Sequence, residues 1–111
     1  MPGKHPFEDV VEATFRKNLR KPGWLLVDLY GRGCPPCTSQ NAEAKIAAGY
    51  KSRAELLRMN VENAKGVLEE FQISGIPTLI LFKDGSRRSQ FVDIPAADGQ
   101  NVLDWLAEEL K

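Results

Sequence analysis

Two cysteines, Cys34 and Cys37, are the residues whose type and spacing most directly predict chemistry in this chain. They flank Pro35 and Pro36, and they are the only two cysteines among 111 residues. Thiols three positions apart can bind zinc, form a structural disulfide or act as a redox-active dithiol. Each of these uses makes a different demand on the rest of the sequence.

The sequence favours the redox dithiol over the other two uses. A structural zinc site needs about four ligands, and the only other candidate ligand is His5, close to the N-terminus. A disulfide that closes a loop of about four residues removes little entropy from the unfolded chain. In a redox dithiol, a thiolate at Cys34 attacks a substrate disulfide, and Cys37 resolves the mixed disulfide that forms.

The elements around the cysteines fit that chemistry. Residues 24–30 (WLLVDLY) form a short apolar run, which predicts a buried and parallel strand. Residues 34–50 predict a helix, because prolines occur only at its start. The free N–H groups and the dipole at a helix N-terminus stabilise a thiolate at Cys34. This strand–CxxC–helix order is more specific than a CxxC motif alone.

Asp28 is the single acid inside the apolar run. If the strand is buried, desolvation raises the pKa of this carboxyl and suits it to proton transfer. The alternative is a carboxylate that reaches water at the edge of a sheet.

The remaining elements predict an α/β sandwich with a mixed sheet. Helical periodicity or capping signals mark residues 7–19, 64–71 (with Asn63 as the cap) and 99–110. Strands are expected at 55–61, 78–82 and 89–93, with an Asp-Gly hairpin turn between the last two. No repeat or linker divides the chain, so residues 1–111 are expected to form one domain.

Composition excludes several classes of protein. Fifteen Lys and Arg balance fifteen Asp and Glu, which argues against a nucleic-acid binder or a polybasic membrane anchor. The hydrophobic fraction of 42% argues against disorder. The longest apolar runs are about five residues, and a bilayer span needs about 20. The first ten residues lack the apolar stretch of a secretory signal, so a cytoplasmic protein is expected.

Three segments resemble the thioredoxin family. They are Leu25–Cys37 (LLVDLYGRGCPPC), Asn60–Glu62 (NVE) and Phe71–Gly85 (FQISGIPTLILFKDG). The resemblance covers roughly residues 20–110. It implies a thioredoxin-like sandwich, with about four strands flanked by helices and the family's first strand missing or short. It also implies a thiol–disulfide oxidoreductase that reduces protein disulfides and needs no cofactor.

The resemblance assigns roles to particular residues. Cys34 would be the exposed attacking thiol and Cys37 the shielded resolving thiol, with Asp28 moving the proton of Cys37. Pro77 would be a cis proline facing the dithiol, and Ile76 would offer backbone hydrogen bonds to an extended substrate. The expected substrate-binding residues are therefore Ile76, Pro77, Gly33, Pro35, Pro36 and Asp93.

Departures from the family pattern concern the surface around the dithiol. Pro35 replaces a glycine and removes a backbone N–H, while Arg32 is either a cation near Cys34 or simply solvated. Tyr30 and Gly33 stand where the family usually has tryptophans. An acid at position 93 either repels acidic substrates or only marks a shifted loop.

These departures leave a second class of function open. The chain could be a partner-binding or redox-sensor module with one dedicated client, or an oxidase or isomerase, rather than a general reductase. The expected partners are disulfide-containing client proteins and a thioredoxin-reductase-like electron donor, without nucleic acid or membrane. A monomer is expected, with a weak dimer through an open strand edge at residues 55–61, which Glu55 and Arg58 would discourage.

Overall fold

The computed structural model describes residues 6–31, 40–92 and 100–110. The elements follow one another as β1 (Glu8–Asp9), α1 (Glu12–Leu19), β2 (Trp24–Tyr30), α2 (Gln40–Tyr50), β3 (Ala54–Asn60), the 3₁₀ turn η2 (Val61–Asn63), α3 (Lys65–Glu70), β4 (Thr78–Lys83), β5 (Ser86–Val92) and α4 (Gln100–Glu109). In the part of the chain described, no helix is long and apolar enough to cross a membrane.

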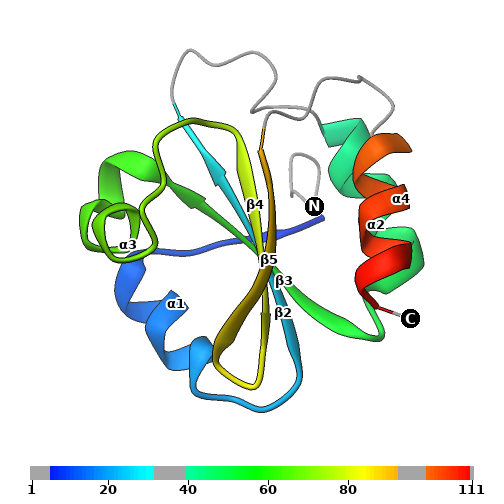
Figure 1. Cartoon of the computed structure of the whole chain (residues 1–111), viewed down its shortest axis with the longest axis horizontal. Helices are drawn as coiled ribbons and strands as arrows, with labels where there is room; N and C mark the ends of the chain where they lie inside the picture. Colours follow the sequence, from blue (N-terminus) through cyan, green and yellow to red (C-terminus); the bar gives the residue numbers. More distant parts are fainter. Residues whose placement is uncertain (1–5, 32–39, 93–99, 111) are drawn as a thin grey trace.

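The five strands form one mixed sheet in the order β1-β3-β2-β4-β5. Strands β1, β3 and β2 are parallel, whereas β4 is antiparallel to both β2 and β5. Helices α1 and α3 cover one face of the sheet, and α2 and α4 cover the other (Figure 1). The predicted α/β sandwich with a mixed sheet is therefore confirmed.

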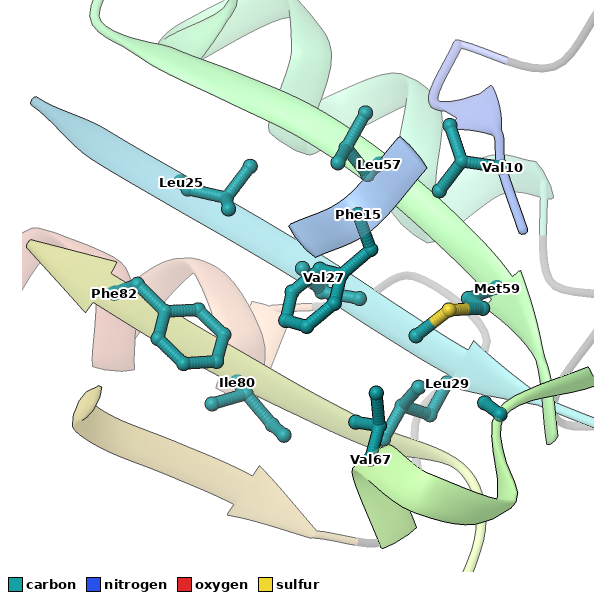
Figure 2. Packing of buried hydrophobic residues seen from close by; sticks show 11 residues of the cluster. Val10, Phe15, Leu25, Val27, Leu29, Leu57, Met59, Val67, Ile80 and Phe82 are labelled. Atoms are coloured by element: carbon teal, nitrogen blue, oxygen red, sulfur yellow. The ribbon is translucent and has the colours of Figure 1, made fainter. Parts of the chain in front are cut away.

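Each face of the sheet has its own apolar core, and the side chains of β2 point alternately into one core and the other. Leu25, Val27 and Leu29 point into the core under α1 and α3, where Phe15 and Phe82 pack with their ring centroids 5.6 Å apart (Figure 2). Leu26 points into the opposite core, with residues of α2 and α4. Successive side chains of a strand point to opposite faces, so Asp28 lies on the same face as Leu26.

The N-terminal segment differs from the helix predicted over residues 7–19. Helix α1 begins only at Glu12, and the short strand β1 pairs with Leu57 and Arg58 of β3. Phe7 belongs to the core of α2 and α4, whereas Val10 belongs to the core of α1 and α3. An extended segment lets two residues three positions apart reach opposite faces, which a helix would not.

The prediction of about four strands is thus corrected to five, with the first strand short. The prediction that β3 forms an open sheet edge is also wrong in part, because β1 covers two of its seven residues. Asn63 does not cap α3, which follows Ala64 without a side-chain cap. Instead, the side chain of Asn60 accepts a hydrogen bond from the Glu62 N–H at the start of η2.

The predicted hairpin turn between β4 and β5 is present. Asp84 and Gly85 have φ values of 52° and 88°, and two successive positive values are characteristic of a type I′ turn. Asp84 anchors this turn, because its Oδ1 accepts a 2.7 Å hydrogen bond from the Gly23 N–H. A Cβ added at Gly85 would lie 3.0 Å from the carbonyl oxygen of Leu19.

Gly85→Ala is expected to destabilise the protein by about 1–2 kcal/mol, because it puts a Cβ on a left-handed residue and against a carbonyl. Urea unfolding at constant pH measures the change. Gly49→Ala is the matched control, since a Cβ there meets nothing within 4 Å and Gly49 lies in α2. The control is expected to be neutral or to stabilise by about 0.5 kcal/mol. An equal loss in both variants would contradict this account of the turn.

Candidate functional site

Three segments converge at one edge of the sheet, where β2 and β3 end and β4 begins. Gly31 follows β2 directly and is buried. A Cβ at Gly31 would lie 2.5 Å from Cδ1 of Ile76 and 3.5 Å from Cγ2 of Val61. Because glycine has no side chain, the loop before β4 rests against the end of β2, three residues before Cys34. Ligands of open α/β sheets bind at such carboxyl ends of strands.

The loop before β4 has a fixed backbone. The Ile76–Pro77 peptide bond is cis, as the family resemblance implied. The hydroxyl of Thr78 donates a 2.6 Å hydrogen bond to the Gly75 carbonyl, which closes the loop across the proline. Pro77 is buried, whereas the side chain of Ile76 is among the large apolar side chains that remain exposed. The loop therefore presents an apolar surface beside the end of β2.

The other predicted site residues lie outside the described part of the chain. They are Gly33, Cys34, Pro35, Pro36, Cys37 and Asp93. The structure therefore places Asp28, Ile76 and Pro77 of the predicted set, and it brings Ile76 to the end of the strand that carries Asp28.

Asp28 is buried in the middle of the sheet, with only 3% of its surface exposed. Its neighbours across the sheet are Arg58 on β3 and Leu79 on β4. The prediction of a buried carboxyl is confirmed, and the alternative of a carboxylate in water at a sheet edge is wrong. The reason is topological, because β2 has a strand on both sides.

Two further ionisable side chains share the buried face of Asp28. Glu43 on α2 and Arg58 on β3 are each 4% exposed. Arg58 Nε lies 3.4 Å from Glu43 Oε2, and Glu43 is the neighbouring group with the largest effect on the Asp28 carboxyl. We call Asp28, Glu43 and Arg58 the buried charge cluster. The expectation that Arg58 stands at an exposed strand edge is wrong, because its side chain lies under α2.

The buried charge cluster raises the pKa of Asp28 well above its ordinary value. Burial is the largest cause, because it penalises the ionised carboxyl. The hydrogen bond with Glu43 and the negative charge of Glu43 act in the same direction, whereas the positive charge of Arg58 opposes them. Asp28 Oδ1 has no hydrogen-bond partner among the residues described.

Arg58 extends the cluster towards the outer edge of the sheet. Its Nη1 lies 3.4 Å from Oδ2 of Asp9 on β1, which also accepts a 2.8 Å hydrogen bond from the Tyr30 hydroxyl. The Arg58 guanidinium carbon stands 4.0 Å from the centre of the Tyr30 ring. Burial, followed by the hydrogen bond to Asp9, raises the pKa of Tyr30 to about 12. Strand β1 thus supplies a partner for both Arg58 and Tyr30.

Sequence reasoning missed the roles of Glu43 and Arg58, although each carries a signal. Arg58 and Leu56 are two positions apart on the strand, so both point to the face of Leu26 and Asp28. Glu43 precedes Ile46 and Tyr50 by three and seven positions, which puts it on the apolar face of α2. A charged residue on each of two apolar faces that meet predicts an ion pair between them.

Comparisons with known proteins identify the family to which this fold and sequence belong. The family model described as Thioredoxin matches residues 6–108. A thioredoxin of Staphylococcus haemolyticus is 31% identical over 97 residues, covering 86% of this chain and 92% of that protein. A thioredoxin of Rickettsia felis is 25% identical, covering 92% and 97%. The oxidised thioredoxin of Plasmodium falciparum, at 17% identity, superimposes with a TM-score of 0.79 over 92% of this chain and 96% of that one. The chain belongs to the thioredoxin family and is a thiol–disulfide oxidoreductase.

Proposed function

We propose that the chain reduces protein disulfides through Cys34 and Cys37, with Asp28 as the proton acceptor for Cys37. The observation that carries the proposal is the buried carboxyl of Asp28 on β2, the strand whose chain continues through Gly31 to Cys34. The pKa of this carboxyl is raised well above its ordinary value by burial, and buried carboxyls with a raised pKa commonly serve as general acids and bases.

The proposed reaction conserves electrons and protons. The Cys34 thiolate attacks one sulfur of the client disulfide, which releases the other client sulfur and leaves a mixed disulfide. In molecules in which Asp28 is ionised, Cys37 then gives its proton to Asp28 and attacks the Cys34 sulfur. The second client sulfur leaves as a thiolate and takes up the proton that Cys37 gave to Asp28, while the first client thiolate takes a proton from water. Two electrons have moved to the client, and Cys34 and Cys37 have become a disulfide.

Ile76 and Pro77 are proposed to hold the client near the dithiol. The exposed Ile76 side chain offers an apolar contact, and its backbone can pair with an extended client segment. Gly33, Pro35, Pro36 and Asp93 are proposed to complete this surface. The chain has no net charge, so apolar contact and backbone pairing, rather than long-range attraction, would select clients.

An external donor must return two electrons to the disulfide after each cycle. We infer a thioredoxin-reductase-like flavin or dithiol protein in the cytoplasm, acting on a monomer. A cytoplasmic reductant is expected to have a potential of about −270 mV, the value typical of thioredoxins. A potential near −120 mV would instead indicate an oxidase.

Cys34→Ser is expected to abolish insulin-disulfide reduction with dithiothreitol as the donor, because no thiolate remains to attack. Turbidity of the released insulin B chain measures the rate. Cys37→Ser is expected to remove turnover but to keep the first attack, so it accumulates mixed disulfides. Full activity in Cys34→Ser would contradict the proposal.

The Cys37→Ser variant also separates a general reductase from a redox sensor. Mixed disulfides trapped in a cell extract are identified by mass spectrometry after reduction. Many clients are expected of a general reductase, and one dominant client would indicate a dedicated module. The Cys34→Ser/Cys37→Ser variant is the control, because it has no thiol with which to trap a client.

Asp28→Asn is expected to slow reduction and to stabilise the fold at neutral pH. The folded state holds the Asp28 proton more tightly than the unfolded state, since its pKa is raised only in the folded state. Stability is therefore fully present below about pH 4 and is lost as pH rises through the folded-state pKa. The asparagine amide carries no titrating proton, so the variant does not lose this stability.

The stability advantage of Asp28→Asn is expected to grow by up to about 1.4 kcal/mol per pH unit above pH 4, until the folded-state pKa is passed. Guanidinium unfolding between pH 4 and pH 9 measures it. Asp104→Asn, on the exposed side of α4, is the control for loss of a carboxylate. A constant difference across this range would show that Asp28 does not hold a proton in the fold.

A further inference from the structure

Two buried carboxyls face one buried guanidinium in the core under α2 and α4. Asp28, Glu43 and Arg58 are each exposed by 4% or less. With both carboxyls ionised, the buried charge cluster has a net charge of minus one, and with one proton bound it is neutral. Because a net charge is costly in an apolar interior, the cluster favours the state with one proton.

The geometry indicates which carboxyl holds that proton. Glu43 Oε2 lies 3.4 Å from Arg58 Nε and so forms the ion pair. Asp28 lies beside Arg58 in the sheet register, and Glu43 is the second carboxyl that acts on it in this core. A hydrogen bond between two carboxyl groups requires that one of them be protonated. Because Glu43 is the carboxyl paired with Arg58, we expect the shared proton to reside on Asp28.

The other groups around the cluster do not change its preference for the state with one bound proton. On β4 the neighbour of Asp28 is Leu79, and α4 contributes Val102 and Leu106 to the same core. Asp9 also contacts Arg58, but its side chain is 51% exposed and so remains solvated. The Tyr30 hydroxyl donates to Asp9, and its raised pKa keeps it neutral at cellular pH. Among the residues described, Glu43 is thus the buried group that opposes ionisation of Asp28.

We propose that Glu43 is a positioning residue that shares one proton with Asp28 and thereby sets the pH at which Asp28 can accept the proton of Cys37. The inference rests on the proposed role of Asp28 in the reaction. Glu43 does not itself need to touch the client or either cysteine. It acts by holding the Asp28 proton in place and by supplying the charge that makes a second buried negative charge unfavourable.

Glu43→Gln is the direct test, because it removes the charge and keeps the shape of the side chain. The amide can donate to an ionised Asp28, and within the described part of the chain Arg58 then keeps Asp28 as its buried counter-charge. The Asp28 titration midpoint is therefore expected to fall by about 1–3 pH units. Carbon-13 NMR of the labelled Asp28 carboxyl measures it directly, without any need for activity. A midpoint within about 0.3 pH units of the wild-type value would overturn the proposal.

Arg58→Gln is expected to move the same midpoint upward, since it removes the one buried positive charge among the residues described. Arg58→Lys keeps the charge and is expected to stay closer to the wild type. Opposite shifts from Glu43→Gln and Arg58→Gln support the proposal, because general loosening of the core would move both in one direction. Shifts in the same direction would overturn it.

Two further variants guard against misfolding and unrelated charge effects. Glu43→Leu removes the same charge and gives α2 an apolar residue that suits the core around Ile46. It is expected to lower the midpoint as Glu43→Gln does. Glu55→Gln is the matched control, because Glu55 lies on β3 at the position that pairs with Leu25, on the opposite face from Arg58. A shift with Glu55→Gln equal to that with Glu43→Gln would contradict the proposal.

The pH profile of mixed-disulfide resolution links the proton to the reaction. With Glu43→Gln, the acid limb of the single-turnover rate is expected to move down by the same number of pH units as the NMR midpoint. In an Asp28→Asn background, Glu43→Gln is expected to leave the acid limb of the single-turnover rate unchanged. If Glu43→Gln shifts the Asp28 midpoint but the wild-type chain does not reduce disulfides, proton sharing in the cluster is supported and the proposed function is rejected. If the wild-type chain reduces disulfides but Glu43→Gln leaves the midpoint unchanged, only the role of Glu43 is rejected.

Discussion

Asp28, Glu43 and Arg58 place three ionisable side chains in the apolar layer between the sheet and helix α2. Because one positive charge faces two carboxyls, the layer is electrically balanced only when a proton is bound. Proton binding by this cluster and the packing of α2 against the sheet therefore depend on each other. The ion pair of Glu43 and Arg58 holds α2 against β3, so a change in the charge of one group alters the contact between a helix and the sheet.

This arrangement works against the stability of the fold. A buried carboxyl with a raised pKa weakens the folded state at neutral pH, where the unfolded chain would ionise freely. The two apolar cores offset that cost, since they bury large side chains on both faces of the sheet, including Phe7, Phe15 and Phe82. Sites that perform proton chemistry commonly depart from optimal stability in this way.

Much of the fold could be predicted from the sequence because its signals are local. The apolar run 24–30 matches β2 residue for residue, and the Asp-Gly pair marks the β4–β5 turn. Strand β1 could be expected only as missing or short, because two residues carry no usable periodicity and only pairing with Leu57 and Arg58 defines them. The roles of Glu43 and Arg58 were missed because they depend on how α2 lies across β3, and spacing along the chain does not encode that contact.

Strand β2 carries Asp28, the residue proposed for proton transfer, and ends beside the loop proposed for client binding. Asp28 precedes Gly31 by three residues, about 10 Å along a strand, and the intervening residues include the buried Leu29. At Gly31 the strand meets Ile76, whose side chain is exposed, whereas Asp28 is closed off beneath α2. If the proposed roles hold, a change at the loop of Ile76 and Pro77 alters which disulfide is held. A change in the buried charge cluster would instead alter the pH at which that disulfide is resolved, because the cluster lies beneath α2 and the loop lies at the end of β2.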